Sequence, residues 1–66
     1  MARFETFVGK ALLMPTEALE SAMGYVQVFC LEHPELYIFS VSHDIVRLGN
    51  DMFVATVVVL FTDYQR

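Results

Sequence analysis

The sequence predicts an α+β fold in which the order β-α-β-β forms a three-stranded antiparallel sheet, of strand order 1-3-2, packed on one helix. The length of 66 residues suits a single domain, so residues 1–66 are taken as one unit. Apolar residues recur at steps of three and four over residues 15–33, which is typical of a helix. Three other stretches are rich in β-branched and aromatic residues, which is typical of strands.

The first strand is expected over residues 3–13, where apolar and polar side chains alternate loosely. Gly9 lies in its middle. A glycine inside a strand marks a bulge or a place where another backbone comes close.

The helix is expected to begin at Pro15, whose fixed φ suits a first turn, with Thr16 as a capping residue and Glu17 near the positive end of the helix dipole. Pro34 ends it, because the residue before a proline, His33, is pushed out of the α region. One face is expected to form the core, with Ala18, Leu19, Ala22, Met23, Val26, Phe29, Cys30 and His33.

Three further apolar residues of this helix, Tyr25, Val28 and Leu31, point away from that core face. A helix that is apolar almost all round is buried on both sides. In so short a chain the second side must meet another subunit, so these residues are predicted to form an interface. A hydrophobic content of 56% agrees with a homo-oligomer.

Residues 36–48 alternate with period two and predict the second strand, and Gly49-Asn50-Asp51 predicts a hairpin turn in which glycine and asparagine accept positive φ. Residues 52–61 are apolar on both faces, which indicates a central strand. This strand fits between the other two, because the first strand, helix and second strand form a right-handed crossover with one free slot. The other sheet face has no cover, so a subunit or a ligand is expected there.

Strict alternation gives the second strand one face with Tyr37, Phe39, Val41, His43 and Ile45, and another with Ile38, Ser40, Ser42, Asp44 and Val46.

Composition restricts the function. The net charge is −4 and the four Lys and Arg residues are scattered, which argues against nucleic-acid binding. The sequence contains no apolar run of membrane-spanning length and no signal-peptide pattern at its start. The single cysteine fits a reducing compartment, so the expected location is the cytoplasm.

Few residues suggest chemistry. We find no phosphate-binding glycine loop, paired catalytic carboxylates or metal-spaced cluster, so we expect no enzyme, no metal and no required cofactor. His43 and Asp44 are neighbours on a strand and point to opposite faces. A pairing of His43 with Glu5 across the sheet is one hypothesis, and a strand-end or subunit contact is the other. Cys30 is read as a core residue and His33 as a residue at the helix end.

Ser40, Ser42 and Asp44 share one face of the second strand, and Thr56 of the third strand is expected to join them. One interpretation is an ordinary solvated face. The other is the polar rim of a ligand site, in which Tyr37 would stack on a flat molecule.

Phe7-Val8-Gly9 near the end of the first strand, and residues 54–61 followed by Asp63, resemble the corresponding parts of the dodecins, flavin-binding proteins of similar size that assemble into hollow dodecamers. The resemblance implies the same order of elements and a flavin-like ligand at subunit seams. Dodecins usually stack a tryptophan at the start of the second strand on the flavin. This chain has no tryptophan, and Tyr37 is nearest that place.

The helix, the strand segment Phe39-Ser40-Val41 and the apolar closing strand are also similar to short sporulation-associated and phage-encoded proteins of unknown role, which implies a phage or mobile-element origin. Two hypotheses lead. The first is a homo-oligomeric interaction protein, such as a phage-type inhibitor or regulator that binds another protein. The second is an oligomeric binder or sponge for a flavin- or nucleotide-like ligand.

Overall fold

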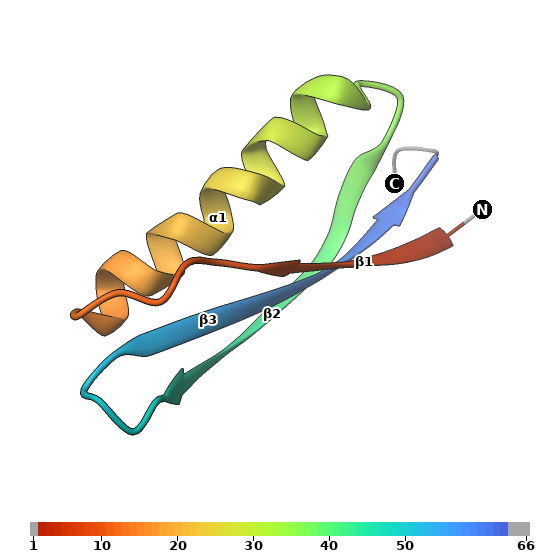
Figure 1. Cartoon of the computed structure of the whole chain (residues 1–66). Coiled ribbons are helices and arrows are strands. Elements are labelled where there is room, and N and C mark those ends of the chain that lie inside the picture. Colours follow the sequence, from red (N-terminus) through yellow and green to blue (C-terminus); the bar gives the residue numbers. More distant parts are fainter. Residues whose placement is uncertain (1, 64–66) are drawn as a thin grey trace.

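A computed structural model of the chain describes residues 2–63. Strand β1 spans Ala2–Val8, helix α1 Pro15–Glu32, strand β2 Tyr37–Arg47 and strand β3 Phe53–Thr62 (Figure 1). The sheet has the order β1-β3-β2, and β3 pairs antiparallel with both neighbours. The predicted α+β class, element order and central strand are therefore confirmed.

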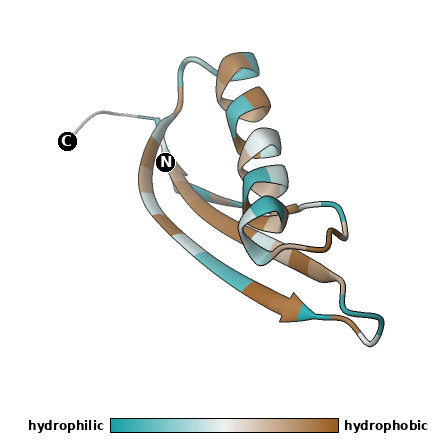
Figure 2. Cartoon of the chain, turned by 90° about the vertical axis from the view of Figure 1, so that its left-hand side faces the viewer, coloured by the Kyte–Doolittle hydropathy of each residue, from teal (hydrophilic) through white to brown (hydrophobic). Residues whose placement is uncertain are grey.

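Helix α1 stands over one face of the sheet, and the core lies between α1 and β3 (Figures 1 and 2). The helix contributes small residues to this layer, and the central strand contributes every second side chain. The fully or almost fully buried apolar residues are Ala18, Ala22, Val26, Ala55, Val57, Val59 and Phe61. Those partly buried against them are Phe7, Leu12, Leu19, Phe29, Cys30, Leu36, Ile45 and Phe53.

The last turns of α1 are held to the sheet through Phe29. Its ring centroid lies 5.5 Å from that of Phe7 in an edge-on contact and 5.0 Å from that of Phe61. His33 stacks on the same ring at 4.3 Å, and the Arg3 guanidinium lies 5.5 Å from its centroid. Aromatic and cation–π contacts of this kind add to the area that the ring buries. Phe29 thus joins the helix to both β1 and β3.

The backbone at Gly9 passes directly against α1. A Cβ atom at this position would lie 2.7 Å from the Ala22 nitrogen and 3.0 Å from the Ala18 carbonyl oxygen. The next residue adds a bond, because the Lys10 N–H donates to Ser21 Oγ at 2.9 Å. The predicted close approach at Gly9 is confirmed, and the neighbouring backbone belongs to the helix.

Strand β1 is shorter than predicted, because it ends at Val8 and not at Leu13. Beyond it the chain turns toward the start of the helix and makes only an isolated bridge to β3. In this bridge the Leu12 and Phe53 backbones exchange two hydrogen bonds, of 2.9 and 2.7 Å. The alternation of residues 3–13 therefore covers a strand and a single bridge separated by the glycine.

The ends of α1 confirm one prediction and correct another. The N-cap is Met14, which makes no side-chain capping bond, and Thr16 lies inside the helix because Pro15 already occupies the first turn. The prediction that Thr16 caps the helix was therefore wrong. The C-cap is His33, whose N–H donates to Phe29 at 3.0 Å, so the end predicted from the proline is confirmed.

The hairpin between β2 and β3 falls where it was predicted, but its positive φ lies elsewhere. Among residues 2–63 the positive φ is that of Asp51, at 62°, and neither Gly49 nor Asn50 adopts one. Aspartate tolerates this conformation better than most residues. The Asp51 carboxylate also accepts a hydrogen bond from Arg47, which closes the turn.

A β-bulge interrupts β2 near its start. Ile38 lies opposite Phe61 and Ser40 lies opposite Leu60. Two steps along β2 therefore match one step along β3, so Phe39 is the extra residue. The bulge moves Ile38 to the helix side and Tyr37 to the side that carries Ser40. Strict alternation had placed Tyr37 and Ile38 on the reverse faces, and that assignment is corrected.

The contact at Gly9 gives a stability prediction. Gly9→Ala should lower the free energy of unfolding by about 1–3 kcal/mol, because the added methyl meets helix backbone that has no flexible end to move aside. Chemical denaturation monitored by circular dichroism measures the change.

Gly24→Ala is the matched control, since a Cβ at Gly24 would meet nothing within 4 Å. Gly24 lies inside α1, so this variant should gain up to about 1 kcal/mol from helix propensity. A Gly9→Ala protein as stable as the parent would show that the helix does not rest on this loop.

Candidate functional site

The face of the sheet turned away from α1 has no element of the described chain over it (Figures 1 and 2). We call it the outer sheet face, and the strand register assigns its side chains. They are Ala2, Phe4, Thr6 and Val8 of β1, Tyr37, Ser40, Ser42, Asp44 and Val46 of β2, and Val54, Thr56, Val58, Leu60 and Thr62 of β3. Apolar groups fill the centre and the β1 side, whereas hydroxyl and carboxyl groups follow β2.

The residues predicted to bind a ligand lie together on this face. Ser40, Ser42 and Asp44 are exposed along β2, and Asp44 lies directly opposite Thr56, as expected. The bulge adds Tyr37 to the same face, which alternation alone would not have done. The group offers hydroxyl donors, one carboxylate acceptor and one aromatic ring along one strand. This arrangement can bind a polar edge and stack on a flat ring.

The predicted interface residues lie on the opposite side of the molecule. Tyr25, Val28 and Leu31 are exposed on the helix, and Leu31 is the most exposed large apolar residue of the described chain, at 76%. They are therefore placed off the core as expected, and their contact with another subunit stays a prediction.

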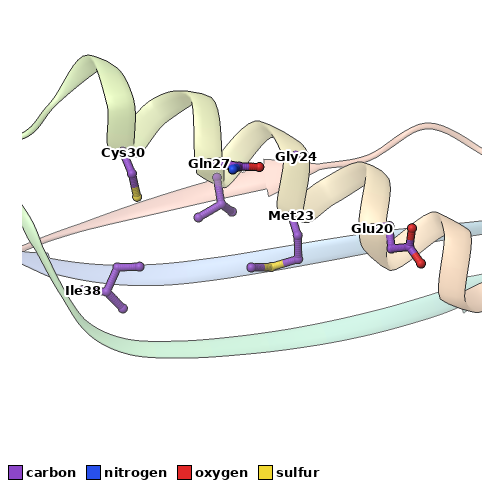
Figure 3. A pocket seen from close by; sticks show the side chains of 7 residues that line it. Glu20, Met23, Gly24, Gln27, Cys30 and Ile38 are labelled. Carbon is purple, nitrogen blue, oxygen red and sulfur yellow. The ribbon is translucent and has the colours of Figure 1, made fainter.

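A groove of about 450 Å³ lies between α1 and β2 (Figure 3). It is lined by Glu20, Met23, Gly24, Val26, Gln27, Cys30 and Ile38. Met23 and Cys30 reach down from the helix and Ile38 approaches from the strand. Met23 was predicted to be in the core and is exposed at this groove instead. The walls are mainly apolar, with Glu20 and Gln27 as the polar groups.

Sequence reasoning missed this groove, because it depends on where the helix lies across the strands. The bulge turns Ile38 toward the helix, and Gly24 leaves space on the helix side. The glycine in the middle of the helix was the one signal that could have indicated it.

The hypothetical pair of Glu5 with His43 is not brought together. Their strands, β1 and β2, are separated by β3, on which Glu5 lies opposite Val59 and His43 opposite Val57. The Glu5 carboxylate instead accepts a hydrogen bond of 2.9 Å from Arg3.

The other two residues with chemical side chains have structural surroundings. Cys30 is half-buried at the margin of the core. His33 stacks on Phe29, and its Nδ1 lies 3.4 Å from the Glu35 carboxylate. The pKa of Glu35 is lowered, mainly by a hydrogen bond from the backbone N–H of Glu35 and to a smaller extent by the contact with His33.

Residues 2–63 contain no group of three or more His, Cys, Asp or Glu side chains placed to hold a metal ion. In the same part of the chain, no helix is both long enough and apolar enough to span a membrane.

The chain matches no protein-family model, no curated protein and no solved structure. The resemblances to dodecins and to short sporulation and phage proteins therefore stay predictions.

Proposed function

We propose that the protein is a homo-oligomeric, non-enzymatic interaction protein of the cytoplasm. It would first bind copies of itself and then present a shared surface to another protein, in the manner of a small phage-type inhibitor or regulator. The observation that carries this proposal is that large apolar side chains are exposed on both sides of a two-layer molecule.

Exposed apolar groups lie on both surfaces that the fold leaves open, as well as in the loops and beside the groove. On the outer sheet face Phe4 is 71% exposed, and on the helix Leu31 is 76% exposed. Single exposed apolar residues are ordinary, but contiguous apolar surfaces mark interaction sites. A second copy on either surface would remove such groups from water.

The dimensions of the chain support the same proposal. The principal extents are 42, 17 and 13 Å, and the radius of gyration is 13.0 Å. A compact chain of this length has a radius of gyration of about 11 Å. A thin, long molecule buries little surface by itself, and domains of about 60 residues are already marginal in this respect. Association supplies the missing burial.

The polar groups suit recognition. Ser40, Ser42 and Asp44 are exposed along one strand, where they can form hydrogen bonds with a partner. The net charge of −4 favours a partner surface that is basic, because complementary charge speeds encounter and excludes wrong partners.

A second candidate is an oligomeric binder or sponge for a flavin- or nucleotide-like ligand held at subunit seams. It is favoured by the bulge at Phe39, which places the ring of Tyr37 on the face that carries the hydroxyl groups of Ser40 and Ser42. A flat molecule could stack on the ring while its polar edge reaches the hydroxyl groups.

The first functional prediction concerns assembly through α1. The parent protein should sediment as a homo-oligomer at micromolar concentration, and Val28→Glu or Leu31→Glu should dissociate it. A carboxylate buried without a partner at an interface costs several kcal/mol. Sedimentation equilibrium measures the masses.

Gln27→Glu is the control for charge, since it adds the same carboxylate to an exposed residue of the same helix on the groove side. It should keep the parent mass. A folded monomer of 7.5 kDa for the parent would refute the proposed function. Unchanged mass in both helix variants would show that the interface lies elsewhere.

The second functional prediction separates the binder from the interaction protein. If a flat ligand stacks on Tyr37, the double variant Tyr37→Ala with Ser42→Ala should bind it about 10- to 100-fold more weakly while the assembly persists. The estimate combines about 0.5–1.5 kcal/mol of stacking with about 1 kcal/mol for one hydrogen bond. Thermal melts with and without added flavin or nucleotide report binding.

Thr6→Ala removes a hydroxyl from the same face on β1 and should leave any ligand shift unchanged. A parent protein whose melting temperature ignores every flavin and nucleotide tested would leave the interaction protein as the function.

A further inference from the structure

Strand β2 forms a free edge of the sheet. It is the longest strand, with 11 residues, and all of them are exposed except Ile45, which is partly buried. One side of β2 is paired with β3, and no other strand of the described chain lies beside its second side. The helix packs mainly over β3 and β1, so the helix face of β2 is the least covered of the three strands, and no element of the described chain lies over its other face.

Proteins usually protect such an edge with a short strand, a proline, a lysine or a bulge. The other edge, β1, is only 7 residues long and carries the ion pair of Arg3 and Glu5. In β2 the bulge lies at Phe39, and the regular stretch Ser40–Val46 beyond it contains no proline, lysine or bulge.

Apolar side chains on both faces of this stretch are also exposed. Val41, on the helix side, is 45% exposed, and Val46, on the outer sheet face, is 51% exposed. A strand that offers free backbone groups and apolar side chains on both faces is suited to pair with another strand.

We propose that the partner of this edge is β2 of a second copy, paired antiparallel over Ser40–Val46 with His43 on the two-fold axis. The two three-stranded sheets would then form one continuous six-stranded sheet. The inference rests on the proposed self-association and adds a second contact surface to the helix surface of Tyr25, Val28 and Leu31.

Two kinds of pair in that register are complementary. Directly opposite residues share a face, so Ser42 meets Asp44 of the second copy, where a hydroxyl can donate to a carboxylate. On the other face, Val41 meets Ile45 of the second copy, an apolar pair. An isologous contact makes each of these pairs twice.

The neighbouring registers are less favourable. An axis at Asp44 would place two carboxylates directly opposite each other, which is destabilising. An axis at Ser42 would bring the bulge at Phe39 into the ladder opposite Ile45. Only the axis at His43 pairs all of Ser40–Val46 without either conflict.

Pairing about this axis places both helices on the same side of the joined sheet. The groove between α1 and β2 in one copy then faces the groove of the other copy across the paired strands. Tyr25, Val28 and Leu31 are exposed and do not line the groove, so they are free to make the second contact of a larger assembly.

The register is tested with opposite charges at one position. Ser42→Glu places a carboxylate opposite Asp44 of the second copy at two symmetric sites, and it should raise the dissociation constant of the assembly about tenfold. Ser42→Lys places an ammonium group there, and it should leave that constant unchanged or lower it. Sedimentation equilibrium at low salt measures both constants, and circular dichroism confirms folding.

Thr6→Glu and Thr6→Lys are the matched controls, because Thr6 lies in the same cross-strand row as Ser42 but on β1. They change the net charge by the same amounts as the Ser42 variants do. The two Thr6 variants should give dissociation constants equal to each other. As a test of contact between chains, Ser42→Glu mixed with Asp44→Lys should form a mixed assembly in preference to either alone, as read by native mass spectrometry.

Pairing of β2 with itself is supported if the dissociation constants of Ser42→Glu and Ser42→Lys differ, those of Thr6→Glu and Thr6→Lys do not, and the mixed assembly forms. Equal constants for the two Ser42 variants, or the same difference at Thr6, overturn it. If the parent oligomer persists in that case, only this inference fails. If the parent is a monomer at every concentration, the proposed function fails with it.

Discussion

A single helix has to cover a three-stranded sheet, and most of the structure follows from this constraint. A helix of 18 residues is about 27 Å long and about 10 Å wide. Three strands are about 14 Å wide, so one helix cannot shield them all. It packs over β3 and β1, which buries the inner side of the central strand. The groove beside β2, the exposed β2 strand and the open outer sheet face are what the helix leaves uncovered.

Two different contacts keep this helix in place. In its first half, Ala18 and Ala22 present almost no side chain, so the loop at Gly9 can approach the helix backbone directly. In its second half the large ring of Phe29 reaches β1 and β3. Small residues bring the layers together at one end and an aromatic residue fills the space at the other, so the two halves of the helix tolerate substitution very differently.

The sequence predicted the elements well, because the signals for them are local. Apolar residues on both faces identified the central strand, and Pro34 identified the end of the helix. Features that depend on pairing were not predictable in the same way. The bulge at Phe39 arises from the fit of β2 to β3, and it decides that Tyr37 shares a face with the serines. In the hairpin, likewise, the residue with positive φ is Asp51. Aspartate accepts this conformation, although glycine is preferred for it.

Strand β3 takes part in every pairing of the sheet, and this determines the order in which the fold can be made. Ribosomes release the chain from its first residue onward, so β1, α1 and β2 are synthesised before any of their sheet hydrogen bonds can form. The β2–β3 hairpin is local and can close first, whereas Ala2 must find Thr62 at the other end of the chain. Until β3 emerges, the free strands are open to mispairing with strands of neighbouring nascent chains, and such mispairing competes with folding for the backbone groups that β3 bonds in the finished sheet.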